Sequence, residues 1–490
     1  MELWLGVENF AKIQSAKVCI NKYSVLVGLN NSGKTFLMQL IQGMSKNWES
    51  LFDDEVINIV ESSQKSKSEN TNECENLNER KEYLLDEQFI ERLLASINRK
   101  LDEEKENLVK QIFGKEIPIG RLFIEATLEA DCAYLIDALY KTEQINEITF
   151  SLPDINSTLT SSFGEHTDKR DILILSRYNT KSKTRTFSFA QRRFYLGPSD
   201  RREHLKTILT RIFQLDSLFL PASRTGLLML YKDFFANKTD QSMDLQIVNG
   251  VLLKNERGGR DLTLPVYEFI RFLQTFSENE NRAERFEDEI LFFEQHVIEG
   301  NIKANQHGNF IYFPQDEKEN IPLFLASSMI NEVAPIELAL TGHDSYERLI
   351  IDEIEASLHP EKQMELVRFL NRINNQGIKL ILSTHSDTFV SKLNNLYILS
   401  ANYPEHISSD ILERSGLEEP DLIDVDNLYV YEFIKQPDGK SIVKQVKGDP
   451  KKGFVFDLFT EAAMKLFDEA MMIEGALNVG KDQNRKIRPE

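Results

Sequence analysis

Apolar residues near the N-terminus form short runs typical of strands. Such runs are found at residues 2–7, 16–20 and 23–27, and the last of them leads directly into a loop that contains two glycines. Residues 36–41, which follow the loop, have the apolar pattern of a helix. The sequence therefore predicts a strand, a loop at 28–35 and a helix in direct succession.

A second α/β pattern begins near Leu323. Two apolar strands are predicted at 349–351 and 379–383, and a helix between them follows Pro360. Buried strands in a parallel sheet are apolar on both faces, so they appear as continuous apolar runs. These two strands and their helix therefore indicate a parallel βαβ unit.

A long stretch of mixed character separates these two parts. Residues 48–115 are charged and mainly helical in pattern, residues 121–198 alternate apolar and polar positions as strands do, and residues 265–299 return to a helical pattern. After the second α/β part, we expect a strand at 427–434 and a terminal helix at 453–474.

The composition is that of a globular protein with sizeable cores. Of 490 residues, 41% are hydrophobic and 28% are charged. The sequence has no apolar run of about 18 residues and no basic and then apolar leader, so we expect a cytoplasmic protein that does not enter a membrane. Cys19, Cys74 and Cys132 are far apart and form no CxxC pair, so neither a disulfide framework nor a zinc site is indicated.

The chain is strongly acidic, with one local exception. Lys and Arg total 58 and Asp and Glu total 78, a net charge of −20 at pH 7, so attraction of the whole chain to nucleic acid is not expected. Residues 177–211, however, hold ten basic side chains interleaved with aromatic ones. This stretch fits either a nucleic-acid contact or amphipathic strands with a solvated basic face.

The loop at 28–35 has the residues of a phosphate-binding loop. Gly28 and Gly33 let the backbone curl so that successive N–H groups face phosphate oxygens. Lys34 can reach the β- and γ-phosphates of a nucleotide, and the hydroxyl of Thr35 can ligate Mg²⁺. The predicted nucleotide-binding residues of the loop are Gly28, Asn30, Asn31, Ser32, Gly33, Lys34 and Thr35.

Acidic residues follow the apolar strand at 349–351, more than three hundred positions after the loop. Asp352 is the predicted carboxylate partner of Mg²⁺, because open α/β sheets place ligand chemistry at the carboxyl ends of their strands. Glu353 can orient the water that attacks the γ-phosphate. The sequence leaves alternatives open for Glu355: it supports Mg²⁺ or a neighbouring subunit, or it simply faces solvent.

A histidine follows the next apolar strand in the same way. A neutral imidazole of His385 could donate a hydrogen bond to a γ-phosphate oxygen and so report its presence. The predicted catalytic residues are Lys34, Glu353 and His385, and the predicted metal ligands are Thr35 and Asp352.

Four segments together resemble one branch of the P-loop ATPases. Residues 28–35, 219–227, 349–360 and 383–387 look, as a set, like the overcoming-lysogenization-defect (OLD) and RecF/SMC-like branch of the ABC ATPases. The resemblance implies an α/β fold, an ABC-type P-loop ATPase head with a mixed sheet, flanking helices, and helical and β insertions. It also implies ATP and Mg²⁺ as cofactors, and ATP over GTP rests on the resemblance alone.

A signature-like segment, 326–332, precedes Asp352. In the resembling class, ATP is typically held between two heads, so the resemblance implies that Ser328 donates to a γ-phosphate across a homodimer or higher homo-oligomer. Met329 stands where the family usually has glycine, which is a departure that affects closure of the two heads. The alternative for Ser328 is a helix cap without contact to nucleotide. Arg224 fits either the role of the Q-loop or a structural ion pair.

The patterns and the resemblance together divide the chain into six predicted parts. They are an N-terminal ATPase part with the P-loop at 1–50, a charged helical insertion at 51–120, a β-rich subdomain at 121–230, a helical lobe at 231–322, the ATPase lobe with signature and catalytic carboxylates at 323–440, and a C-terminal helical tail at 441–490.

The layout resembles ATPase subunits without a nuclease of their own, such as those of the Septu and PARIS antiphage systems. The chain after His385 leaves little room for a nuclease domain, and Asp424-Val425-Asp426 is interpreted as a loop. We therefore expect an ATP-hydrolysing sensor or regulatory subunit of a bacterial antiphage system that acts with a separate effector, a nuclease or toxin. The alternatives are a RecF/SMC-like DNA-repair ATPase that binds duplex DNA directly, and a nucleotide-gated scaffold whose slow hydrolysis times the release of a partner.

Overall fold

The structure of the 490-residue chain is a computed structural model. It describes residues 1–52, 54–62, 79–141, 147–152, 157–162, 170–194, 198–213, 215–231, 245–248, 251–254, 262–305, 308–316, 319–456 and 464–474.

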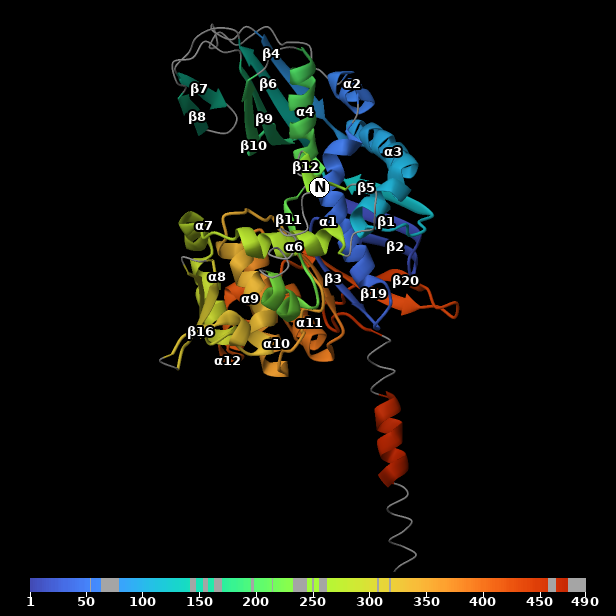
Figure 1. The fold of residues 1–490 in the computed structure, drawn as a ribbon, viewed down its shortest axis with the longest axis vertical. Coiled ribbons are helices and arrows are strands. Elements are labelled where there is room, and N and C mark those ends of the chain that lie inside the picture. Colours follow the sequence, from blue (N-terminus) through green and yellow to red (C-terminus); the bar gives the residue numbers. More distant parts are fainter. Residues whose placement is uncertain are drawn as a thin grey trace, which may run out of the picture.

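A nine-stranded mixed sheet lies at the centre of the fold (Figure 1). Its strands are β1 (Glu2–Phe10), β2 (Ile13–Cys19), β3 (Tyr23–Gly28), β5 (Arg121–Thr127), β11 (Ser217–Leu220), β17 (Arg348–Ile351), β18 (Lys379–Thr384), β19 (Leu428–Lys435) and β20 (Ser441–Val446). Their order across the sheet is β11-β17-β18-β3-β19-β20-β2-β1-β5. The five strands from β11 to β19 run parallel, whereas β19 with β20, β2 with β1, and β1 with β5 are antiparallel pairs.

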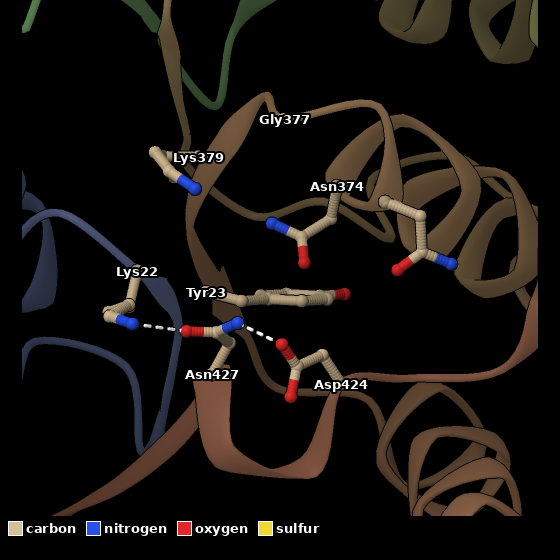
Figure 2. Close-up of a pocket in the computed structure, with 8 residues that line it drawn as sticks. Lys22, Tyr23, Asn374, Gly377, Lys379, Asp424 and Asn427 are labelled. Carbon is tan, nitrogen blue, oxygen red and sulfur yellow. Dashed lines mark hydrogen bonds between the residues drawn. The ribbon is translucent and has the colours of Figure 1, made fainter. Parts of the chain in front are cut away.

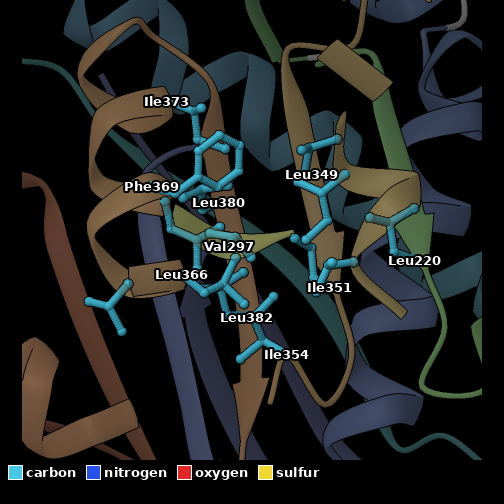
Figure 3. Packing of buried hydrophobic residues seen from close by; sticks show 14 of the residues in the cluster. Leu220, Val297, Leu349, Ile351, Ile354, Leu366, Phe369, Ile373, Leu380 and Leu382 are labelled. Atoms are coloured by element: carbon cyan, nitrogen blue, oxygen red, sulfur yellow. The ribbon is translucent and has the colours of Figure 1, made fainter. Parts of the chain in front are cut away.

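The parallel strands are buried on both faces of the sheet. In β17, Leu349 and Ile351 belong to one apolar cluster and Ile350 belongs to the cluster on the other face. In β18, Leu380 and Leu382 belong to the same apolar cluster as Leu349 and Ile351 (Figure 3). Because both faces are covered by helices, the strands carry apolar residues at most positions, and this is why they are recognisable in the sequence as apolar runs.

Helices cover one face of the parallel half. They are α6 (Leu264–Thr275), α7 (Glu280–Arg285), α8 (Glu287–Phe292), α9 (Ser328–Thr341), α10 (Pro360–Asn375), α11 (Asp387–Asn402) and α12 (Ser409–Arg414). On α10, Leu366, Phe369 and Ile373 recur at helical spacing and pack against β18 (Figure 3). β17, α10 and β18 form the predicted parallel βαβ unit, which the pairing of the two strands confirms.

The other face of the sheet packs against a second group of helices. These are α1 (Lys34–Leu51), α2 (Asp54–Ser62), α3 (Glu87–Phe113) and α4 (Pro198–Phe213). Asp86 caps α3 by accepting a hydrogen bond from the N–H of Phe89, and α3 ends at Gly114, whose φ of 72° is a conformation that glycine adopts without strain. The rings of Trp48 and Phe213 stack with their centroids 5.7 Å apart, which joins α1 to α4.

A separate antiparallel sheet lies beside this second group of helices. Its strands are β4 (Glu79–Leu85), β6 (Cys132–Lys141), β9 (Arg170–Asn179) and β10 (Arg185–Phe194), in the order β10-β9-β6-β4. Figure 1 shows this sheet and α4 at the top of the molecule, at the far end from α8 to α12. The four-stranded sheet is thus built from two stretches of the chain that flank α3.

Three of the expected parts contain strands that pair with strands of other parts. Residues 51–120, expected to be helical, include strand β4, whose partner β6 lies outside that range. Residues 121–230, expected to be a subdomain of their own, contribute β5 and β11 to the two edges of the central sheet. The tail at 441–490, expected to be helical, begins with β20 because a turn at Gly439 folds the chain back onto β19.

The predicted terminal helix at 453–474 is described only in part. Residues 464–474 are helical, and every side chain in that helix is exposed. Phe454 and Phe456 are buried in the core before it, and residues 457–463 lie outside the described residues.

Candidate nucleotide site

The predicted phosphate-binding loop joins β3 to α1 at the carboxyl edge of the parallel strands. Gly33 has a φ of 103°, in the region that favours glycine. A side chain at Gly28 would bring a Cβ atom within 2.7 Å of the Cβ of Phe433 on the neighbouring strand β19. Both glycines are therefore required by the backbone path, and α1 begins directly at Lys34.

The Lys34 ammonium lies inside the loop. Its Nζ donates to the carbonyl oxygens of Gly28, at 2.8 Å, and of Leu29, at 3.0 Å. Burial lowers the pKa of Lys34 to about 8, and the negative charges of Asp352, Glu353 and Glu355 oppose that shift. The loop therefore holds its lysine next to carboxylates that come from a distant part of the chain.

The loop meets the predicted metal carboxylate by a direct hydrogen bond. The Thr35 hydroxyl donates to Oδ2 of Asp352 over 2.7 Å, although 317 positions separate the two residues. The second carboxylate oxygen, Oδ1, accepts a 2.5 Å hydrogen bond from the hydroxyl of Ser383, and only 2% of Asp352 is exposed. Asp352 is thereby fixed between the P-loop helix and the end of β18.

Glu353 turns away from the strand that ends before it. It has a φ of 47°, which is uncommon for a residue with a side chain, and its N–H donates to the hydroxyl of Ser383 at 2.8 Å. Its side chain is 44% exposed, so it points to space that a substrate can enter. Burial, and then the charges of Asp352 and Glu355, raise the pKa of Glu353, which brings the carboxylate closer to the range of an effective general base.

His385 lies beside Glu353 at the end of β18. Its Nε2 is 3.7 Å from Oε1 of Glu353, and its backbone N–H donates to Oε1 of Glu355 over 2.5 Å. Burial and then the nearby charge of Lys34 lower the pKa of His385, so the imidazole is neutral at pH 7. A neutral imidazole keeps one N–H donor and one acceptor, as the predicted role requires.

Arg224 connects the signature-like helix to the backbone of Asp352 and Glu353. It is fully buried, and its guanidinium donates to the carbonyls of Glu332, at 2.6 Å, and of Asp352, at 2.7 Å, and more weakly to that of Glu353, at 3.2 Å. Its Nε also pairs with Oε2 of Glu332 at 3.1 Å. Of the two predicted interpretations, the ion pair is present, and it spans the boundary between α9 and the end of β17.

Ser328 is placed apart from the residues described so far. It is the first residue of α9, its side chain is exposed, and the cap of that helix is the hydroxyl of Ser327, which accepts from the N–H of Ile330. Within the described part of the chain, no hydrogen bond joins the Ser328 side chain to the P-loop. Met329 is half-buried and packs against the core.

One chain thus brings the P-loop, Asp352, Glu353 and His385 together and leaves Ser328 facing solvent. Sequence reasoning did not assign a role to Ser383, which holds Asp352 and the backbone of Glu353. The signal for it lies in the sheet register: Ile351 pairs with Leu382, so the next residue on each strand, Asp352 and Ser383, must be neighbours.

The donors at this site fit a magnesium-bound nucleotide. The hydroxyl of Thr35 and the carboxylate of Asp352 are the hard oxygen ligands that Mg²⁺ prefers, and the backbone N–H groups of the loop at the start of α1 suit phosphate oxygens. A bound Mg²⁺ would take the place of the hydrogen bond between these two side chains. Among the described residues, no three His, Cys, Asp or Glu side chains are gathered into a metal-binding group.

At least five of the ten basic side chains in the stretch at 177–211 form ion pairs with acids. Arg177 pairs with Glu129, and Arg185 lies 2.9 Å from Glu82 and 3.0 Å from Asp137. Further along, Arg202 pairs with Asp54, Lys206 with Glu203, and Arg211 with Asp216. These pairs reduce the net positive charge that the stretch offers to a polyanion.

Two further expectations concern the rest of the chain. No helix in the described ranges is both long and apolar enough to cross a membrane. Residues 424–426 are interpreted as a loop. Asp424 caps the short 3₁₀ turn Val425–Asn427 by accepting a hydrogen bond from the N–H of Asp426 at 3.2 Å.

Comparison with solved structures gives weak likenesses to SMC heads. They include the SMC head domain from Thermotoga maritima, with 11% identity, 91% of this chain and 100% of that chain covered, and a TM-score of 0.30. An SmcHead bound to the C-winged helix domain of ScpA has 12% identity, coverage of 91% and 97%, and a TM-score of 0.30. An Smc head domain with an extended coiled coil, bound to the C-terminal domain of ScpA derived from Pyrococcus furiosus, has 10% identity, coverage of 96% and 98%, and the same score. A TM-score of 0.30 is too low to assign a fold or a function to this chain.

The fold assignment therefore rests on the chain itself. The mixed sheet with helices on both faces, and the P-loop between β3 and α1, confirm the predicted α/β class and are consistent with an ABC-type P-loop ATPase head.

None of the curated proteins matches the chain. One family profile matches residues 103–391, more than half of the chain, and this range includes Asp352, Glu353 and His385. The chain accordingly belongs to the family described as "AAA domain, putative AbiEii toxin, Type IV TA system".

Proposed function

We propose that the protein binds ATP with Mg²⁺ in the P-loop and hydrolyses it. The observation that carries this proposal is the 2.7 Å hydrogen bond between the hydroxyl of Thr35 and the carboxylate of Asp352. Two oxygen ligands for Mg²⁺ from distant parts of the chain meet at the start of a P-loop helix, where phosphate oxygens are favoured.

Each neighbouring side chain has a chemical role in this proposal. Bound Mg²⁺ would neutralise charge that develops on the phosphates. The Lys34 ammonium, held at the centre of the loop, binds phosphate oxygens. The Glu353 carboxylate orients the attacking water and accepts its proton, and the neutral imidazole of His385, 3.7 Å away, donates to a phosphate oxygen. Ser383 holds Asp352 in place.

We further propose that two copies of the chain close on ATP. Ser328 is exposed at the N-terminus of α9, the 14-residue helix that begins inside the signature-like segment 326–332, and it has no partner in the P-loop of its own chain. Apolar side chains close to these two segments are exposed as well: Leu29 in the P-loop at 47%, and Phe324 and Leu325 before Ser328 at 51% and 66%. Exposed apolar groups next to a site support contact with a second protein surface.

The biological role proposed is regulation of a separate effector in antiphage defence. The family description names a toxin of a Type IV TA system, which fits an ATPase that works with a second protein. The ion pairs along 177–211 favour this role over direct binding of duplex DNA, because a polyanion would have to displace the acids that hold those arginines.

A glutamine in place of Glu353 tests the catalytic part of the proposal. Glu353→Gln keeps the shape of the side chain and removes the base, so ATP should still bind while turnover falls by about 10²–10⁴-fold. The measurements are release of phosphate and binding of a fluorescent ATP analogue. Normal turnover in this variant would show that Glu353 is not the base that activates water.

The biological role is tested by purification from the native host with ATP, followed by mass spectrometry, which should recover an effector protein. Recovery of duplex DNA without a protein partner would contradict that role.

A further inference from the structure

A polar pocket lies at the edge of the central sheet opposite the P-loop. It has a volume of about 230 Å³ and is surrounded by the starts of three neighbouring strands (Figure 2). Tyr23 is the first residue of β3, Lys379 is the first residue of β18, and Asn427 directly precedes β19. The proposed nucleotide site is at the other ends of β3 and β18, and a six-residue strand spans roughly 20 Å. The two places are therefore separate.

The pocket holds an excess of positive charge. The ammonium of Lys379 is partly buried, and no hydrogen bond or ion pair to it is found in the part of the chain that the structure describes. Burial and then the like charge of Lys22 lower the pKa of Lys379, and the negative charges of Asp424 and Glu347 oppose that shift. Lys22 donates to Oδ1 of Asn427, whose amide in turn donates to Asp424, so the carboxylate in the pocket is already engaged (Figure 2).

A buried donor lies in the wall of the same pocket. The ring of Tyr23 extends between the side chain of Asn374 and those of Asp424 and Asn427 (Figure 2). Its hydroxyl has no hydrogen-bond partner among the described residues, and only 1% of the residue is exposed. Burial raises the pKa of Tyr23, so the hydroxyl stays protonated and can donate. Buried polar groups without partners are uncommon in proteins and call for an explanation.

We infer that this pocket binds a small oxyanion, a phosphate or a carboxylate group, through Lys379 and Lys22. An anion would give the Lys379 ammonium its missing partner and relieve its repulsion from Lys22. The volume of the pocket lies below the roughly 300–1,000 Å³ typical of sites for larger ligands, so the ligand is a compact ion or a single anionic group. The inference goes beyond the proposed ATPase and does not depend on it.

The test uses the full-length chain with Lys34→Ala, so that the P-loop does not contribute phosphate binding. Inorganic phosphate and acetate are titrated separately by calorimetry, and whichever binds identifies the group. Lys379→Gln should weaken binding about tenfold or more, because it removes a hydrogen bond to a charged group. Lys444→Gln, at an exposed position of β20, is the control and should not change binding.

Two results would overturn the inference: neither anion binds, or the Lys379→Gln chain binds as tightly as its parent. If Lys379→Gln fails to fold, as judged by circular dichroism, Lys22→Gln takes its place with the same expected direction. In a chain with native Lys34, Lys379→Gln should leave ATP binding unchanged. A loss of ATP binding there would show that the pocket is not a site of its own, whereas failure of the proposed ATPase would leave anion binding intact.

Discussion

The two ends of the same parallel strands place a lysine among different charges. At the carboxyl edge, Lys34 lies among Asp352, Glu353 and Glu355. At the amino edge, Lys379 lies beside a second lysine, Lys22. Burial lowers the pKa of both lysines, so the difference between them comes from their neighbours.

That difference indicates what each edge can bind. At the carboxyl edge the carboxylates stabilise Lys34 and leave oxygen ligands for a divalent cation, so the edge suits a nucleotide together with its metal. At the amino edge two lysines and one carboxylate, Asp424, line the pocket, so positive charge is in excess and the edge suits an anion without a metal. A lysine at each edge thus supports a different kind of site.

The largest expected effect comes from removing the lysine of the carboxyl edge. Lys34→Ala should abolish ATP binding, because the phosphates lose the only ammonium held inside the described P-loop. Calorimetric titration with a non-hydrolysable ATP analogue measures this, and Lys444→Gln should bind normally. If Lys34→Ala bound ATP like the unchanged protein, the two edges would not differ in the way described above.

Arg224 gives the next largest effect, because it supports the carboxyl edge from within the core. Arg224→Leu leaves Glu332 as a buried charge without its partner, so the free energy of unfolding should fall by about 3–5 kcal/mol. Denaturant unfolding measures it. The double variant Arg224→Leu with Glu332→Leu removes both charges and should recover part of the loss. Additive losses would show that the ion pair does not stabilise this edge.

A bulky charge at Ser328 tests whether the carboxyl edge needs a second chain. Ser328→Arg should prevent ATP-dependent pairing of two copies, which light scattering after gel filtration detects in a Glu353→Gln background. Ser409→Arg is the matched control, because Ser409 is also the exposed first residue of a helix, α12. Pairing that persists with Ser328→Arg would contradict closure across two heads, and anion binding at the amino edge should be the same in all these variants.

The smallest effect expected is a change in ATP affinity with pH. The pKa of Lys34 is lowered to about 8, so above that pH the free protein has lost the proton that phosphate binding requires. Affinity should be nearly constant below pH 8 and should fall by at most tenfold for each pH unit above it. Titration calorimetry at pH 9, in buffers of different ionisation enthalpy, should show proton uptake on binding. No uptake would mean that Lys34 remains charged there.

The sequence predicts the local parts of the carboxyl edge well. The glycine loop follows an apolar strand and precedes a helix, and the apolar runs at 349–351 and 379–383 become β17 and β18. These elements follow from short-range patterns, because a strand covered on both faces must be apolar throughout. The four-stranded sheet was harder to predict from the sequence. Its strand β4 is charged and pairs with β6, which follows a 27-residue helix.

What the sequence determined by itself was the kind of chemistry: a phosphate-binding loop, acids and a histidine after buried strands, and an α/β fold to carry them. Only the tertiary structure decided which residues meet. Thr35 reaches Asp352, Ser383 holds that carboxylate, and Lys379 lies beside Lys22, because β18 is placed between β17 and β3 in a fixed register. Register depends on packing across the whole sheet, because a shift by one residue would move every side chain of a strand to the other face.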